Sequence, residues 1–366
     1  PIAKYFSWSR STVSLAYSLN FMAFGASALA VGQIAGKIGF RRTIFVGGFL
    51  YGLGLFLGSF SNNSYELYIF YGFLAGIGTG ALYGPMATII AYWFSTRKGL
   101  VTGLIFAGSG AGTILFPSLG RYLIASYDWR SAFLILGLGA IFINSLAALL
   151  LKEKPKDIGL KAYGDQEFSE TSEMDGLNSA LDASERSISA HNWTSRSAAK
   201  TKAYWSLMFT YFFCCICHSI TLLHTFSYAA DLGIARNIAA FTLSLAGVFI
   251  IIGRVGFGAL ADIIGCRRSL LLALTSQTFV AIWLLFSRDV WNFYIWAIFF
   301  GLGYGGTFAQ YPVITRDYFG LGPLASIFGS QMGVSTAAMA IGGFFGSFFY
   351  DLTGSYTATF TLSFFS

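Results

Sequence analysis

The chain has 366 residues, of which 55% are hydrophobic and 11% are charged. A soluble domain usually carries about 25% charged residues, so this composition excludes an ordinary soluble protein and favours one embedded in a membrane. The net charge is +7, but the Lys and Arg residues concentrate in alternate short loops and one central linker, which indicates membrane orientation rather than nucleic-acid binding.

Apolar stretches long enough to cross a bilayer, about 17–25 residues, recur along the chain. They predict an all-α membrane protein with helices at residues 11–36, 43–61, 66–93, 99–123, 130–151, 204–230, 237–260, 269–287, 292–314 and 323–349, and a shorter apolar run at 355–366. The segment between the fifth and sixth helices is polar and lacks a hydrophobic period, which predicts a solvated linker. We therefore expect an N-terminal bundle at 1–151, a linker at 152–203 and a C-terminal bundle at 204–366.

Small residues follow a regular row in the fourth of these helices. Gly99, Gly103, Ala107 and Ala111 recur at four-residue spacing. Such a row lets two helix backbones approach closely, so it predicts a close contact with another helix.

One loop sequence occurs twice, each time at the end of an apolar segment. GQIAGKIGFRR runs from Gly32 to Arg42 and GALADIIGCRR from Gly258 to Arg268, with Gly, Ala, Gly, Arg and Arg at the same offsets. The copies begin 226 residues apart. A repeat of this length predicts a duplicated helical bundle, as membrane transporters often show.

The repeat also relates helix 11–36 to helix 237–260. The second of these is preceded by helix 204–230 and the first by none, so we expect an intact protein of twelve helices whose first helix, and the end of whose last, lie outside this chain. Apart from Arg254, sixteen Lys and Arg residues lie in the linker or in loops on its side, and six lie on the other side. This asymmetry predicts that the linker is cytoplasmic.

Arg254 is the one charged residue within the apolar segment 237–260. Burying arginine in a bilayer costs at least about 2.5–3.5 kcal/mol, so we expect it to face a cavity and to mark a substrate or ion path. Every Asp and Glu lies in a loop, in the linker or at a helix end. A carboxylate substrate would balance the charge, and the planar guanidinium could hold both of its oxygens. The alternative is that Arg254 pairs with the missing helix and only holds the bundles together.

The repeated loop resembles the one that follows the second helix of each bundle in the major facilitator superfamily, Gly-x-x-x-Asp-x-x-Gly-x-Arg-Arg/Lys. The C-terminal copy matches it with Gly258, Asp262, Gly265, Arg267 and Arg268. This resemblance implies a transporter of two pseudo-symmetric six-helix bundles.

The N-terminal copy departs from this pattern at one position. It has Gly32, Gly39, Arg41 and Arg42 in place, but Gly36 stands where the acid belongs. We expect the charged residues of both copies to tie the loops to neighbouring helix ends, and to bias the inward and outward states, rather than to touch substrate.

A narrower resemblance is to the monocarboxylate transporters and their bacterial oxalate/formate-antiporter-like relatives. It lies in YWFSTRKGLVTGLIFAGSG (Tyr92 to Gly110), YDWRSAFLILG (Tyr127 to Gly137), HTFSYAADLGI (His224 to Ile234), DLTGSY (Asp351 to Tyr356) and the dipeptide Gly253-Arg254. The resemblance implies that the arginine eight residues before the loop's acid, here Arg254, binds a substrate carboxylate.

Two departures narrow the expected substrate. Mammalian carriers of this group hold an aspartate four residues before the arginine, where this chain has Ile250. Oxalate exchangers have a lysine in the eleventh helix, and Ser335 to Gly343 contains none. We therefore expect a monoanion held by one cation rather than a dicarboxylate held by two.

Six further polar residues within the predicted helices are candidates for function. His218 and His224 have unperturbed pKa values near 6.5 and are the candidates for carrying a coupled proton; the resemblance favours His224, whereas depth in the membrane favours His218. Tyr83, Tyr304, Gln310 and Tyr311 lie on segments 66–93 and 292–314, which line a central cavity in the related fold. For each of these four residues taken singly, packing is the favoured interpretation.

These observations predict a secondary transporter that moves a small organic anion, a monocarboxylate, by alternating access across a plasma or bacterial inner membrane. Its substrate-binding residues would be Arg254, His224, Tyr83, Tyr304, Gln310 and Tyr311, with protons as a second cargo. We expect a monomer in a lipid bilayer, with no cofactor, no metal, no catalytic residues and no nucleic-acid partner. An oxalate/formate-type exchanger, an exporter of another small molecule and a non-transporting membrane sensor remain as alternatives.

Overall fold

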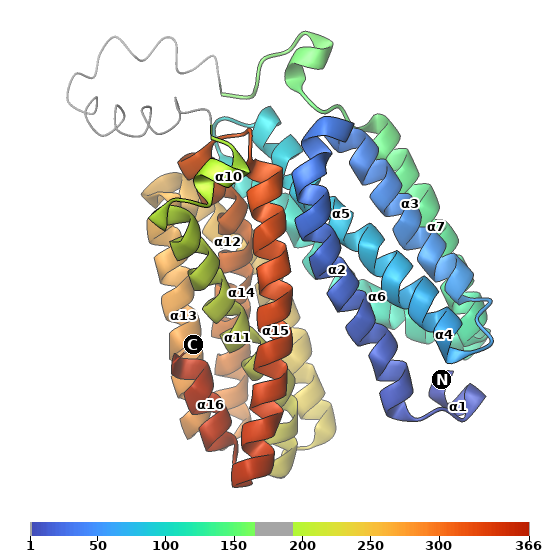
Figure 1. Ribbon diagram of the computed structural model, residues 1–366. Coiled ribbons are helices and arrows are strands. Elements are labelled where there is room, and N and C mark those ends of the chain that lie inside the picture. Colours follow the sequence, from blue (N-terminus) through green and yellow to red (C-terminus); the bar gives the residue numbers. More distant parts are fainter. Residues whose placement is uncertain (1, 165–192, 366) are drawn as a thin grey trace. The chain divides into compact units, whose positions relative to one another are not determined.

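The computed structural model describes residues 2–164 and 193–365 as a set of helices (Figure 1). The helices are α1 (Ile2–Phe6), α2 (Arg10–Ile38), α3 (Phe40–Gly58), α4 (Ser64–Leu67), the π-helix η1 (Tyr68–Ala75), α5 (Gly76–Trp93), α6 (Lys98–Ser126), α7 (Trp129–Leu150), the 3-10 helix η2 (Pro155–Ile158), α10 (Ser195–Ala198), α11 (Lys202–Asp231), α12 (Arg236–Ile264), α13 (Cys266–Phe286), α14 (Val290–Phe319), α15 (Leu324–Thr353) and α16 (Tyr356–Phe365).

Each apolar segment predicted from the sequence coincides with one of these helices. Within the described residues, nine helices are long and apolar enough to cross a membrane, with α4, η1 and α5 together forming one of them. The fold class is therefore an all-α membrane protein, as predicted. The helix α12 runs on to Ile264, so Arg254 lies ten residues, on the order of 15 Å, from its end. This is about half the thickness of a hydrocarbon layer of roughly 30 Å.

Polar side chains mark where several helices begin. Ser9 accepts a hydrogen bond from the Thr12 amide at the start of α2, and Asp128 accepts one of 2.6 Å from the Ser131 amide at the start of α7. The first four amides of a helix have no partner within the helix, so these side-chain oxygens stabilise the helix ends.

The two copies of the repeated loop make the same one-residue turn. Gly39 joins α2 to α3 with φ of 100°, and Gly265 joins α12 to α13 with φ of 89°. Positive φ is disfavoured for residues that have a Cβ, which explains why both copies have glycine at this offset. The duplication seen in the sequence is thus a duplication of backbone geometry.

The described helices divide into two compact units. The first comprises the described parts of residues 1–93, 116–200 and 319–336. Its buried core includes Ala35, Phe40 and Ile89, together with Ala325 from the start of α15. Gly32 lies in this unit, where a side chain would collide with the Ala325 carbonyl, so the first glycine of the N-terminal motif permits close packing of α2 on α15.

The second unit comprises the described parts of residues 94–115, 201–318 and 337–366. It includes the start of α6, which crosses α12 where Gly99 and Gly103 meet the backbone of Gly258 and Arg254. This contact confirms the prediction from the small-residue row in α6. Because α6 and α15 are each shared between the units, the division into bundles at 1–151 and 204–366 stays a prediction.

Candidate functional site

Arg254 is buried in the second unit, with 5% of its surface exposed. Its backbone lies between two glycines, since a side chain at Gly103 of α6 would collide with the Arg254 carbonyl and one at Gly305 of α14 would lie 2.8 Å from the Arg254 amide. Because α6 and α14 both lie directly against the backbone of residue 254, they fix the position of its side chain along the membrane normal.

The groups around the Arg254 guanidinium come from α6 and α14. Nη1 donates a hydrogen bond of 2.5 Å to the Phe106 carbonyl and a second hydrogen bond to the Ser109 hydroxyl. The guanidinium carbon lies 4.9 Å from the centre of the Phe308 ring. A carbonyl, a hydroxyl and an aromatic face all attract a cation, so the charge is stabilised by neutral dipoles and a π face.

The depth and charge of Arg254 predicted a side chain facing a cavity. In the structure the side chain lies against α6 and α14 with 5% of the residue exposed, and its place on a substrate path stays a prediction. The exposure is low because Phe106 and Phe308 meet edge to face, with centroids 5.3 Å apart, beside the guanidinium. These two rings pack beside the guanidinium and cover part of it.

His218 lies in the core of the second unit, with 2% of its surface exposed. Its ring meets the Tyr304 ring edge to face at 4.4 Å, and its Nε2 is 3.8 Å from the Cys214 sulfur. The structure therefore brings together two of the predicted residues, His218 and Tyr304, in contacts between α11 and α14.

His224 lies on the same helix but contacts different neighbours. Its imidazole packs against Gly346 of α15, where a Cβ would lie 2.7 Å from Cδ2, and its ring centroid is 6.1 Å from that of Tyr356 in α16. Its Nε2 is buried and has no hydrogen-bond partner among the described residues. Six residues of helix place the two histidines on different faces, as the sequence predicted.

Gln310 and Tyr311 are fully buried and join helices within the second unit. Gln310 donates a hydrogen bond of 2.7 Å to the Ser269 hydroxyl, and the Tyr311 ring lies 3.9 Å from that of Tyr211. Through these contacts both residues pack within the helical core, which is one of the two roles that the sequence allowed for them. Tyr83 belongs to the first unit, where its ring meets that of Phe24 at 5.5 Å.

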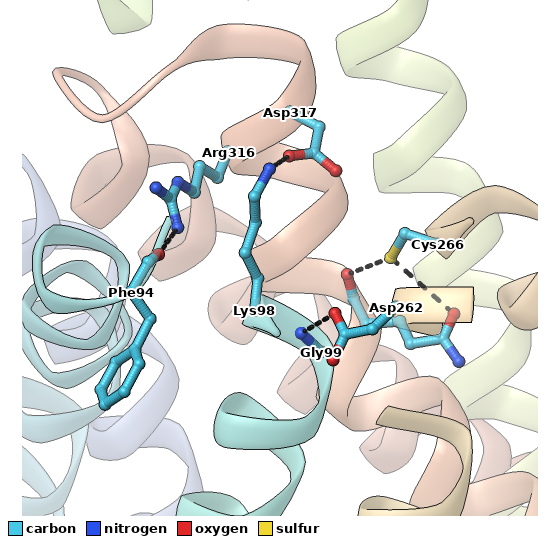
Figure 2. Close-up of polar contacts among 8 residues, drawn as sticks. Phe94, Lys98, Gly99, Asp262, Cys266, Arg316 and Asp317 are labelled. Atoms are coloured by element: carbon cyan, nitrogen blue, oxygen red, sulfur yellow. Dashed lines mark hydrogen bonds and ion pairs between the residues drawn. The ribbon is translucent and has the colours of Figure 1, made fainter. Parts of the chain in front are cut away.

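Asp262 of the C-terminal motif caps α6, as Figure 2 shows. Its carboxylate accepts hydrogen bonds of 2.8 Å from the amides of both Gly99 and Leu100. A carboxylate at a helix N-terminus is stabilised by the unpaired amides and by the helix dipole. The prediction that this acid ties its loop to a neighbouring helix end is confirmed, while its influence on the inward and outward states stays a prediction.

Two further contacts lie in the same part of the second unit (Figure 2). Lys98 pairs with Asp317 at 2.9 Å, and Arg316 donates to the Phe94 carbonyl at 2.5 Å. The Lys98 and Asp317 side chains are 34% and 41% exposed. An ion pair this exposed stabilises a protein by about 1 kcal/mol or less.

Arg41 of the N-terminal motif binds the end of α7 without the help of an acid at position 36. Its guanidinium donates hydrogen bonds to the Ala148 and Leu149 carbonyls at 2.8 and 2.6 Å, and its amide donates to Glu153. The last carbonyls of a helix attract cations, so this arginine too ties its loop to a helix end. Arg42, Arg267 and Arg268 are exposed.

Sequence reasoning missed the groups that hold Arg254. Ser109 is 145 residues from Arg254 in the chain, and nothing in its spacing links it to an arginine. The small-residue row does not point to it either, because Ser109 lies two residues, about 200° around the helix, from both Ala107 and Ala111.

A cavity of about 390 Å³ lies elsewhere in the second unit, among α11, α13 and α16. Its walls include Phe209, Phe213, Cys214 and Gln277. None of the site residues predicted from the sequence lines it.

Long membrane helices, a duplicated loop geometry and a cation buried within one of those helices are features of a membrane transporter. The family model of the Major Facilitator Superfamily matches residues 1–365. The chain belongs to the major facilitator superfamily. It is therefore a multi-pass secondary transporter rather than an enzyme.

Two of its relatives are named for a particular class of substrate. The chain is 29% identical over 360 residues to monocarboxylate transporter 12-B of Danio rerio, covering 90% of this chain and 71% of that protein. It is 28% identical over 346 residues to monocarboxylate transporter 12 of Homo sapiens, covering 88% of this chain and 64% of the human protein.

Solved structures agree with the fold. The E. coli fucose:proton symporter FucP superposes with a TM-score of 0.72 at 14% identity, covering 98% of this chain and 91% of that chain. The human organic anion transporter MFSD10 superposes with a TM-score of 0.70 at 15% identity, covering 96% and 82% of the two chains. At these identities, the likeness supports the fold alone.

Proposed function

We propose that this protein transports a small organic anion, a monocarboxylate, and that Arg254 binds the carboxylate. The observation that carries the proposal is a guanidinium that lies on the order of 15 Å inside a membrane helix and donates hydrogen bonds to two neutral groups, the Phe106 carbonyl and the Ser109 hydroxyl. A cation at that depth stabilises a bound anion strongly because the surroundings screen charge weakly. The relatives named as monocarboxylate transporters support the same substrate class.

The expected route is alternating access between two bundles, with the linker on the cytoplasmic side. A carboxylate that accepts hydrogen bonds from two N–H groups of the guanidinium would be neutralised by its positive charge. The loaded site would then carry little net charge during the conformational change. Arg254 supplies one positive charge, which suits a monoanion.

For a coupled proton, we propose His224 as the carrier and keep His218 as the second candidate. The support for His224 is its buried Nε2, which has no hydrogen-bond partner among the described residues and is thus available to a proton. Tyr304, half-buried beside His218, remains a candidate for contact with substrate, as does Tyr83. Gln310 and Tyr311 would need to leave their packing contacts to take that role.

The test is uptake of labelled acetate, pyruvate and L-lactate by the purified protein in liposomes. Arg254→Ala should abolish uptake, and Arg254→Lys should reduce it by about tenfold or more, because lysine keeps the charge but loses the two-pronged geometry. Arg121→Ala, which removes an exposed arginine outside the repeated loop, is the matched control and should transport like the wild type. If Arg254→Ala melts and transports as the wild type does, this function is wrong.

Proton coupling is tested in the same liposomes under an imposed pH gradient. We expect His224→Gln to make uptake insensitive to the gradient, while His218→Gln keeps the dependence. Retained dependence in His224→Gln, with loss in His218→Gln, would move the role to His218.

A further inference from the structure

Two acceptors that hold Arg254 in this structure come from one short stretch of α6. The Phe106 carbonyl accepts from Nη1, and so does the Ser109 hydroxyl, which itself donates a hydrogen bond of 2.9 Å to the Phe106 carbonyl. The three groups form a closed arrangement on the surface of α6. An arginine in this arrangement is bound to another helix rather than presented to a ligand.

The guanidinium is largely covered in the same conformation. Only 5% of Arg254 is exposed, the Phe308 ring lies over it, and a Cβ added to Gly110 would lie 3.6 Å from Nη1. While the side chain stays on α6, Nη1 is therefore occupied by its α6 acceptors.

We propose that Ser109 and the Phe106 carbonyl hold Arg254 in a resting position on α6, and that the transported anion binds by displacing this contact. The displacement step rests on the proposed function, since it takes the anion to be the ligand of Arg254. The resting position itself rests only on the contacts between α6 and α12.

The close crossing of α6 and α12 explains how binding of the anion could change the contact between these two helices. Gly103 keeps the α6 backbone against the carbonyl of residue 254, and the hydrogen bonds from Arg254 to Phe106 and Ser109 lie beside this crossing. When the anion binds the guanidinium, these hydrogen bonds between α12 and α6 are lost. A ligand shifts a conformational equilibrium only through different contacts in the two states, and this exchange of partners supplies such a difference.

The resting contact also lowers the apparent affinity for the anion. A ligand that binds only the released state is weakened by the fraction of protein in which the arginine is released. Removing the Ser109 hydroxyl takes away one of the acceptors and should raise that fraction about two- to tenfold, the range expected for one hydrogen bond.

The first experiment needs no transported anion. The full-length protein in detergent is treated with phenylglyoxal, and the adduct at Arg254 is followed by peptide mass spectrometry, with the adduct at Arg41 as internal reference. Ser109→Ala should speed modification of Arg254 about two- to tenfold, and Ser109→Thr, which keeps the hydroxyl, should react like the wild type. Equal rates at Arg254 in Ser109→Ala and the wild type, at equal melting temperatures, would overturn the resting position.

The second experiment tests displacement by measuring the concentration dependence of L-lactate uptake in liposomes. Ser109→Ala should lower KM about two- to tenfold, and Ser109→Thr should restore the wild-type value. An unchanged KM would overturn displacement, and a raised KM would make Ser109 a ligand of the anion instead. If no variant takes up L-lactate, acetate or pyruvate, the proposed function fails, and the phenylglyoxal rates still decide whether Arg254 rests on α6.

Discussion

Replacing Gly103 by alanine should destabilise the protein, because the backbone of α12 occupies the space of the new methyl group. A Cβ at residue 103 would collide with the carbonyl oxygen of Arg254 and lie 2.9 Å from its carbonyl carbon. Gly108, on the same helix, is exposed, and a Cβ there would meet no atom within 4 Å. The two positions thus form a matched pair.

Both substitutions replace glycine by alanine inside a helix, which by itself favours the helix by about 0.5–1 kcal/mol. The difference between the Gly103 and Gly108 variants therefore isolates the collision. Inserting a methyl group into a close-packed contact costs typically about 1–3 kcal/mol, and a backbone carbonyl has no rotamer by which to move away. We expect Gly103→Ala to be less stable than Gly108→Ala by about 1–3 kcal/mol.

Reversible denaturant unfolding in detergent micelles measures this difference, and uptake by the same variants in liposomes gives its functional consequence. Pushing α6 away from α12 should also pull the Phe106 carbonyl from Arg254 and release its side chain, so Gly103→Ala should lower the KM for L-lactate, as Ser109→Ala does, while Gly108→Ala should keep the wild-type value. Two variants of equal stability and equal KM would refute the close crossing of α6 and α12 near Arg254.

Two further predictions use the same unfolding assay. Gly265→Ala should lower the free energy of unfolding by about 1–2 kcal/mol relative to Gly256→Ala. Residue 265 has φ of 89°, which disfavours a residue with a Cβ, whereas residue 256 is helical with open space around it. Equal stabilities of the two variants would show that the turn does not need glycine. The hydrogen bond from the Ser131 amide lowers the pKa of Asp128 below its usual value, so its carboxylate stabilises the fold above about pH 3.9, the unfolded value, and this contribution is lost as the pH falls through the lowered pKa. Asp128→Asn should therefore be less stable than the wild type at pH 7, with a gap that closes in acid, and a gap independent of pH would contradict the charged cap.

The fold could be predicted almost entirely from local sequence. A helix that crosses a bilayer must satisfy its own backbone hydrogen bonds and must be apolar for about 20 residues, so segment 237–260 identified α12 without knowledge of its neighbours. Likewise, the glycines at 39 and 265 marked the two turns, because positive φ is a property of a single residue. The ends of helices were the least predictable, and the longer α12 places Arg254 deeper than its sequence boundary implied.

The candidate site was predictable only in part. The presence of an arginine deep within a membrane span followed from the sequence alone, and its role in binding substrate is our proposal. The partners of this arginine did not follow from the sequence, since residues 106 and 109 are far away in the chain, and the fully buried positions of Gln310 and His218 could not be told from cavity-lining ones by type or spacing. Each of these residues is compatible with both environments, and only the packing of α13 and α14 decides between them.

The sequence by itself determined that this is a duplicated helical membrane transporter with one arginine near the middle of a span, because hydrophobicity, glycine turns and charge placement are properties of contiguous residues. Tertiary structure alone decided that the arginine lies on α6 and that the two histidines contact different helices. These outcomes depend on which helices cross and at what level, and in this protein that level is set by backbone contacts between glycines more than a hundred residues apart in the chain.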